Sequence, residues 1–146
     1  MKEQHVKCIE SMLKLSNEDR LKYADARLWK IQEGLREMGY SCAKIHETIL
    51  GLFRFFVSAD LDCTQPENDF FTKVTGCFYT NDQFFNLTNH GRKEDYMKSV
   101  LNWMNSLSPQ LFTDVFTFGA YILTADGPLK EDEIKLCEVI EEYRPD

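Results

Sequence analysis

The sequence predicts an all-α fold of about seven helices. Val and Ile, which are enriched in β-strands, together account for only 13 of the 146 residues, and Gly and Pro account for 11. Apolar residues recur every three or four positions along most of the chain, which is the period of an amphipathic helix. A chain of 146 residues with 43% hydrophobic and 28% charged residues is typical of one globular domain. We therefore expect a single domain over residues 1–146, with N-terminal helices in 1–40 and a duplicated helical core in 41–146.

Two helices are expected before residue 40. Val6, Ile9 and Met12 mark a short first helix that ends near Ser16. The Ser16 hydroxyl can cap the next helix, with Asp19 three residues further on. This second helix is long and ends at Gly39, because glycine readily adopts the left-handed conformation that ends many helices. Its predicted buried stripe consists of Leu21, Ala24, Leu28, Ile31, Leu35 and Met38.

Two further helices are apolar on nearly all sides and are expected at the centre of the domain. The first covers residues 45–57 and the second covers 110–124. Ser108 followed by Pro109 is a strong start signal for the second, since serine caps well and proline is tolerated in the first turn. A helix without a polar face is surrounded by other elements.

Three more helices complete the prediction. The segment from Thr64 to Glu67 has capping-box spacing and opens a helix from about Gln65 to Phe78. An Asn- and Asp-rich connector over 79–91 follows, and then a helix over 96–107. The last helix is predicted to bury Ile134, Cys137, Ile140 and Tyr143.

The two central helices and the turns after them match at an offset of 66 residues, which indicates an internal duplication. Ala59, Asp60 and Glu67 correspond to Ala125, Asp126 and Glu133. In each copy an Asp ends the central helix and a Glu lies seven residues further on, in the first turn of the next helix. A tight turn would bring both carboxylates to one end of the bundle.

Negative charge is concentrated at these two corners. Residues 58–72 contain four acids and no base, and residues 126–142 contain seven acids and two bases. Carboxylates and loop carbonyls are ligands of Ca²⁺, Mg²⁺ or Mn²⁺, while no closely spaced Cys pair favours Zn²⁺. An EF-hand is excluded because Gln65 replaces its glycine and Phe71 replaces its last Glu. Two interpretations stay open: a divalent-cation site, or acids that stabilise helix N-termini and turns.

The second copy, Thr124 to Glu133, resembles the Ala-Asp-Gly…Glu signature of the TerB-like, tellurite-resistance-associated helical domains. The first copy, Ala59 to Glu67, is less similar, since Leu61 replaces the usual glycine. The likeness covers residues from Ser41 to the C-terminus. It implies an all-α fold with two hairpins related by a pseudo-twofold axis, a link with tellurite and other stress responses in bacteria, and no enzymatic activity. It also implies a divalent-cation site at the motif acids Asp60, Glu67, Asp126 and Glu133.

Composition excludes several functional classes. The net charge of -7 repels phosphate backbones and argues against a nucleic-acid partner. The longest apolar run, from Val115 to Ala125, is shorter than the roughly 18 residues of a membrane span. The N-terminus lacks the pattern of an export signal, and the five cysteines contain no Cys-x-x-Cys pair, so we expect a cytoplasmic protein with reduced thiols.

The leading hypothesis is therefore a non-enzymatic bacterial cytoplasmic domain that acts through a protein partner in a stress response, with a divalent cation at its acidic corners. The alternative is a protein-interaction module whose acids bind no metal. A metal-assisted hydrolase ranks last, because it also needs an open coordination position in a concave pocket. The partner and the oligomeric state, including a homodimer, are left open.

Overall fold

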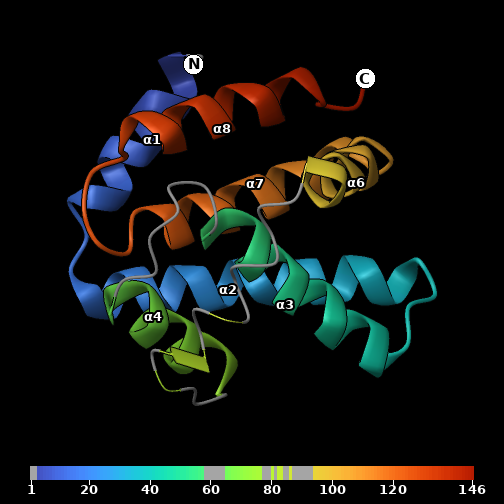
Figure 1. Ribbon diagram of the computed structural model, residues 1–146, viewed down its shortest axis with the longest axis horizontal. Helices are drawn as coiled ribbons and strands as arrows, with labels where there is room; N and C mark the ends of the chain where they lie inside the picture. Colours follow the sequence, from blue (N-terminus) through green and yellow to red (C-terminus); the bar gives the residue numbers. More distant parts are fainter. Residues whose placement is uncertain (1–2, 58–64, 77–79, 81, 84–85, 87–93) are drawn as a thin grey trace.

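The computed structural model describes residues 3–57, 65–76, 80, 82–83, 86 and 94–146, and within these residues the protein is all-helical. The predicted fold class is confirmed, and none of the described helices is long and apolar enough to cross a membrane. The described part contains seven helices and no strand (Figure 1): α1 (Glu3–Leu13), α2 (Asn17–Glu37), α3 (Cys42–Val57), α4 (Gln65–Thr75), α6 (Glu94–Asn105), α7 (Pro109–Leu123) and α8 (Glu131–Glu142).

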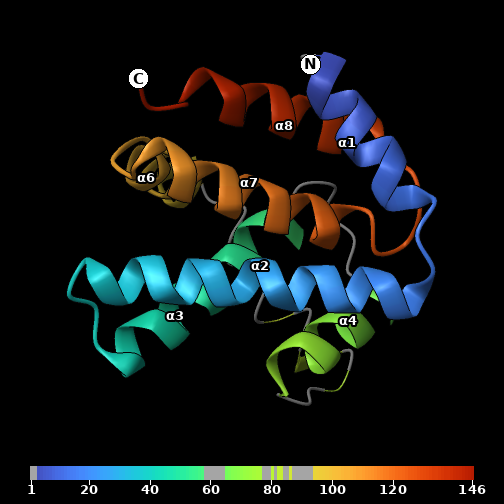
Figure 2. The same ribbon diagram turned by 180° about the vertical axis from the view of Figure 1, so that it is seen from behind.

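Helix α7 is the central element of the bundle. It lies between α8 on one side and α2 on the other in both views (Figures 1 and 2). It also packs against α3, α4 and α6, and most of its side chains are buried. The prediction of a central helix over 110–124 is thus confirmed, and its nearly continuous apolar sequence is explained by neighbours on every side.

Aromatic rings join α3, α4 and α7 at the centre of the core. Phe53 on α3 makes edge-to-face contacts with Phe71 on α4, at a centroid distance of 4.8 Å, and with Phe118 on α7, at 5.6 Å. Phe70 lies 6.2 Å from the Phe53 ring. Such contacts contribute roughly 0.5–1.5 kcal/mol each beyond simple burial.

The predicted helix boundaries in the N-terminal half and before α7 are confirmed by their hydrogen bonds. The Asp19 N–H donates to the Ser16 hydroxyl, and the Leu111 N–H donates to the Ser108 hydroxyl, both at 3.2 Å. At the end of α2, Gly39 has a φ of 90°. The N–H groups of Gly39 and Tyr40 donate to carbonyls of the last turn, which is a Schellman arrangement.

Three details of the sequence prediction are wrong. Helix α4 ends at Thr75 and not near Phe78, because Gly76 adopts a φ of 74°. Met38 caps the end of α2 and is 47% exposed, so the buried stripe stops at Leu35. Ile134 is 36% exposed, because α8 turns Glu133 inward in its place. The buried face of α8 consists of Glu133, Leu136, Cys137 and Ile140.

The helix boundaries around the two corners repeat at a fixed offset. Helices α3 and α7 end at Val57 and Leu123, and α4 and α8 begin at Gln65 and Glu131, so both pairs differ by 66 residues. This is the offset found in the sequence. Glu67 and Glu133 are each the third residue of their helix, and each is 2% exposed.

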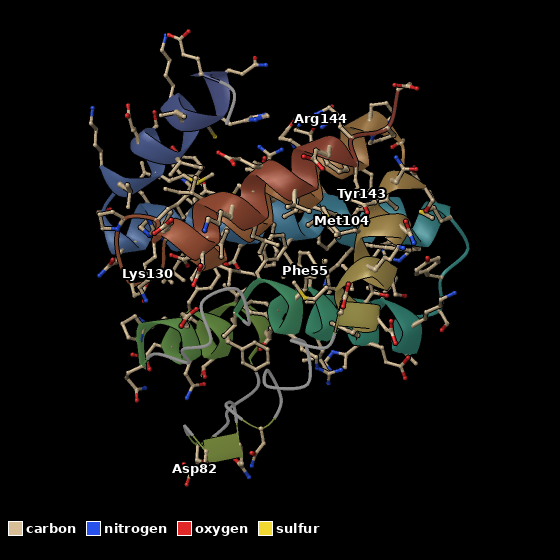
Figure 3. The ribbon with its side chains drawn as sticks, turned by 45° about the horizontal axis from the view of Figure 1, so that its top comes forward. Phe55, Asp82, Met104, Lys130, Tyr143 and Arg144 are labelled. Carbon is tan, nitrogen blue, oxygen red and sulfur yellow. The ribbon has the colours of Figure 1, made fainter. Side chains whose placement is uncertain are left out.

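Helix α8 is fixed to its neighbours mainly at its C-terminal end. Arg144 donates to both carboxylate oxygens of Glu141, at 2.7 and 3.1 Å, and to the Thr113 hydroxyl of α7 at 3.1 Å. The Nδ1 atom of His5, on α1, lies 3.1 Å from Oε1 of Glu141. Lys130 and Arg144 mark the two ends of this helix in Figure 3. The cluster therefore joins α1, α7 and α8 at one point.

Candidate functional site

The second acidic corner is the turn between α7 and α8, and its two predicted acids meet at Lys130. Asp126 Oδ2 lies 3.5 Å from Lys130 Nζ, and Glu133 Oε1 accepts the Lys130 backbone N–H at 2.8 Å. The Asp126 side chain is only 13% exposed. Both acids thus contact Lys130, Asp126 at the ammonium and Glu133 at the backbone N–H.

Glu133 acts as the capping-box residue of α8. Its carboxylate satisfies one of the backbone N–H groups that every helix leaves without a partner at its N-terminus. This agrees with the interpretation of the acids as helix-stabilising groups. It leaves the divalent-cation interpretation untested, because a carboxylate has a second oxygen.

The first corner is only partly visible. Glu67 is buried at the position equivalent to Glu133. Asp60 lies outside the described residues, so the structure does not place the fourth predicted acid. Within the described ranges, no three His, Cys, Asp or Glu side chains are grouped so that they could hold a metal ion. The four-carboxylate site therefore stays a prediction.

The two corners line one pocket of about 310 Å³. Pro66 belongs to the first corner and Ala125 to the second, and the N-terminal end of α2 forms the third wall. The charged lining residues are Arg20, Lys73 and Asp69. The lining of this pocket therefore carries one more positive than negative charge, although the two corners are acidic in sequence.

Arg20 is a buried cation that the sequence analysis missed. It is 8% exposed and donates to the Met12 carbonyl at 3.0 Å, the Tyr121 carbonyl at 3.3 Å and the Thr124 hydroxyl at 2.8 Å. Burial lowers the pKa of its guanidinium from the ordinary value. Arg20 joins the end of α1, the start of α2 and the end of α7, so its role is to position the second corner. The one hint of this burial in the sequence is that Arg20 lies next to Leu21, the first residue of the predicted buried stripe.

A larger cavity lies on the other side of the bundle, between the C-terminal half of α2 and the turn between α6 and α7. We call it the α2 groove, and its volume is about 820 Å³. Trp29 and Met38 line it and are 61% and 47% exposed. Leu107 and Leu111 are buried residues of its wall. Sequence analysis could have singled out Trp29, since it lies outside the apolar stripe of a helix whose exposed face is otherwise mostly polar.

One side of the α2 groove contains a buried ion pair. Asp114 of α7 is 4% exposed, and its Oδ1 lies 2.7 Å from Arg27 Nη1 on α2. Gln110 donates to the same oxygen at 3.2 Å. A buried carboxylate is stable in this position because both partners compensate for its lost hydration. The pair fixes α2 relative to α7 and so gives the groove a defined shape.

Cys137 is a structural cysteine and is not suited to be a nucleophile. Cys137 is buried, and burial, with smaller contributions from Glu133, Glu141 and Glu138, raises its pKa to about 12. A thiol with this pKa stays protonated near neutral pH, so it is a poor nucleophile and a poor metal ligand. Cys137 is part of the core.

Comparison with known proteins adds no functional assignment. No protein-family model matches the chain, and no curated protein or solved structure is significantly similar to it. Function must therefore be inferred from the residues themselves.

Proposed function

We propose that the protein is a non-enzymatic helical binding domain that holds a partner protein in the α2 groove. The observation that carries this proposal is the exposure of Trp29, at 61%, beside a cavity of about 820 Å³. Tryptophan is the residue most enriched among energetically dominant interface contacts. An exposed tryptophan side chain does not stabilise the free domain. A partner that covers it removes this apolar surface from water, which favours binding.

The partner that fits this groove is an amphipathic helix with basic residues beside its apolar stripe. Trp29 and Met38 are nine residues apart on α2, which corresponds to about 13 Å along the helix axis. Apolar side chains seven or eight residues apart on a partner helix lie on one face and have a similar axial spacing, about 11–12 Å. The groove is also lined by Lys30, Glu33 and Glu37. Glu33 pairs with Arg36 at 2.6 Å, so Glu37 is the carboxylate that would attract a lysine or arginine of the partner.

Charge argues against a second copy of the chain in this groove. A symmetric dimer places the same patch on both sides of the interface. The patch includes two carboxylates and one ammonium, from Glu33, Glu37 and Lys30, so two copies would bring a net negative surface against itself, and each chain carries a net charge of -7. A basic helix avoids this repulsion.

Removing the Trp29 side chain should weaken binding of a basic helix by about tenfold or more. The probe is a dye-labelled 18-residue peptide with leucines at helical spacing and lysines on both flanks, and the measurement is fluorescence anisotropy. Tyr23→Ala is the matched control, because Tyr23 is an exposed aromatic residue of the same helix outside the groove. The same peptide with glutamates in place of lysines should bind much more weakly. Equal binding of both peptides, or concentration-dependent dimerisation of the protein alone, would contradict the proposal.

A second candidate function is divalent-cation binding at the corner between α7 and α8. It is favoured by the position of Asp126, whose Oδ2 lies 3.5 Å from the Lys130 ammonium and so already faces a positive charge. Glu133 lies in the same turn, where it accepts the Lys130 backbone N–H at 2.8 Å. Carboxylates grouped in a turn suit Ca²⁺, Mg²⁺ or Mn²⁺. With the resemblance to TerB-like domains, such a site would place the chain in a bacterial response to tellurite or a similar stress.

If this corner binds a cation, Ca²⁺, Mg²⁺ or Mn²⁺ at 100 times its Kd should stabilise the fold by about 2.7 kcal/mol in thermal melting. Asp126→Asn should abolish the shift, and Lys130→Gln should increase it because the competing ammonium is removed. Glu131→Gln is the matched control, since Glu131 is an exposed acid of the same helix turn that pairs with Lys135. A shift that is the same in all four proteins would exclude this corner as the site.

A further inference from the structure

A second cavity, separate from the α2 groove, lies between α3 and α6. We call it the α3–α6 pocket, and its volume is about 350 Å³. Three aromatic side chains line it: Tyr40 from the turn after α2, and Tyr96 and Trp103 from α6. Its volume is near the lower end of the range of small-molecule sites, about 300–1,000 Å³.

Two hydrogen bonds hold these aromatic walls in place without a ligand. The Tyr96 hydroxyl donates to the Gly51 carbonyl at 2.9 Å. Trp103 Nε1 donates to the Tyr40 hydroxyl oxygen at 3.0 Å. Because Gly51 has no side chain, the Tyr96 hydroxyl can approach α3 closely: a Cβ at this position would lie 3.2 Å from that oxygen. The pocket is therefore preformed, which lowers the entropic cost of filling it.

Two donors beside the pocket have no acceptor among the described residues. The Tyr40 hydroxyl accepts a hydrogen bond from Trp103, and this contact leaves its own O–H available to donate. Lys44 Nζ lies 4.1 Å from the centroid of the Tyr40 ring and forms no ion pair with a described carboxylate. The described lining contains no Asp or Glu. An ammonium and a hydroxyl proton thus lie next to the same ring, and both are suited to an anionic group.

We propose that the α3–α6 pocket binds a small aromatic carboxylate. Tyr96 and Trp103 would contact the flat apolar body of the ligand, and Lys44 and the Tyr40 hydroxyl would bind its carboxylate. A cationic ligand is disfavoured, because Lys44 already occupies the face of Tyr40 and would repel it. The site has different lining residues from the α2 groove, so it is independent of the function proposed for that groove.

The test is an NMR titration that follows the indole N–H signals of the full chain. The protein has two tryptophans, so Trp29→Phe leaves Trp103 as the single indole reporter. The probes are 2-naphthoate and its neutral analogue 2-naphthylmethanol. We expect 2-naphthoate to shift the Trp103 signal saturably and 2-naphthylmethanol to bind roughly fivefold more weakly or worse, because it lacks the charge that Lys44 would pair with.

Two variants locate the binding site. Lys44→Gln should weaken 2-naphthoate binding by roughly fivefold or more, whereas Lys98→Gln, which removes the same charge from the exposed face of α6, should leave it unchanged. Ser99→Phe adds a bulky side chain at an exposed position of the lining and should block the pocket without disturbing the core. No saturable shift of Trp103 at millimolar 2-naphthoate, or equal binding of the neutral analogue, would overturn the proposal.

Discussion

Gly119→Ala is expected to lower the free energy of unfolding by about 2 kcal/mol or more, although alanine is the better helix former. Gly119 lies in the middle of α7, where a Cβ would overlap the ring of Phe56 from α3. The ring cannot move aside easily, because Phe56 is 1% exposed and packs against Phe55 at a centroid distance of 5.2 Å. The measurement is chemical denaturation followed by circular dichroism.

Gly34→Ala is the matched control for this prediction. Gly34 also lies within a helix, in the last turn of α2, but the nearest atom to an added Cβ is Leu111 Cδ1, at 2.8 Å, which is the end of a flexible side chain. We expect little change, since the gain in helix propensity of about 1 kcal/mol offsets a small adjustment of the leucine. Phe56→Leu should recover part of the stability lost in Gly119→Ala. Equal stability of Gly119→Ala and the parent protein would show that α3 and α7 do not approach as closely as the structure indicates.

Arg20→Met is expected to destabilise the fold by about 3 kcal/mol, because three buried acceptors lose a charged donor. Those acceptors are on Met12, Tyr121 and Thr124, so the loss affects the end of α1 and the end of α7 together. Arg20→Lys should recover only part of the stability, since an ammonium cannot reproduce the planar set of guanidinium donors. The measurement is denaturation together with hydrogen exchange, which should show faster exchange in α1.

The control for Arg20 is Arg36→Met on the same helix. The Arg36 side chain is 54% exposed, and its ion pair with Glu33 at 2.6 Å is solvated. Exposed ion pairs contribute about 1 kcal/mol or less. Equal losses for the two arginine variants would mean that Arg20 does not have the buried bridging role assigned to it.

Local signals in the sequence were sufficient for the helices but not for the contacts between them. Ser16, Gly39 and Ser108 predicted helix ends because capping depends on residues within one turn. The second central helix was predicted from its start signal at Ser108 and Pro109 and from its nearly continuous apolar sequence. Ile134 was assigned to the buried face of α8 because its spacing also fits a stripe, and only the packed structure shows that Glu133 takes this place.

The same difference between local signals and contacts between distant helices applies to the predicted site. The placement of Asp126 and Glu133 around one turn is a local property, because only seven residues separate them, and their use as a metal site stays a prediction. Arg20 and Thr124 are 104 residues apart, and Arg27 and Asp114 are 87 residues apart, so no periodicity could pair them. The two cavities argued to bind ligands also form between helices that are distant in sequence.

The contact between Gly119 and Phe56 also shows that the two segments related by the 66-residue offset are not interchangeable. At the 66-residue offset, Gly119 corresponds to Phe53 and Phe56 corresponds to Ile122. If both helices had the α3 sequence, Phe53 would take the place of Gly119 and would overlap Phe56. If both had the α7 sequence, Ile122 would take the place of Phe56 and would leave a void next to Gly119. The crossing of α3 with α7 therefore requires one helix of each sequence.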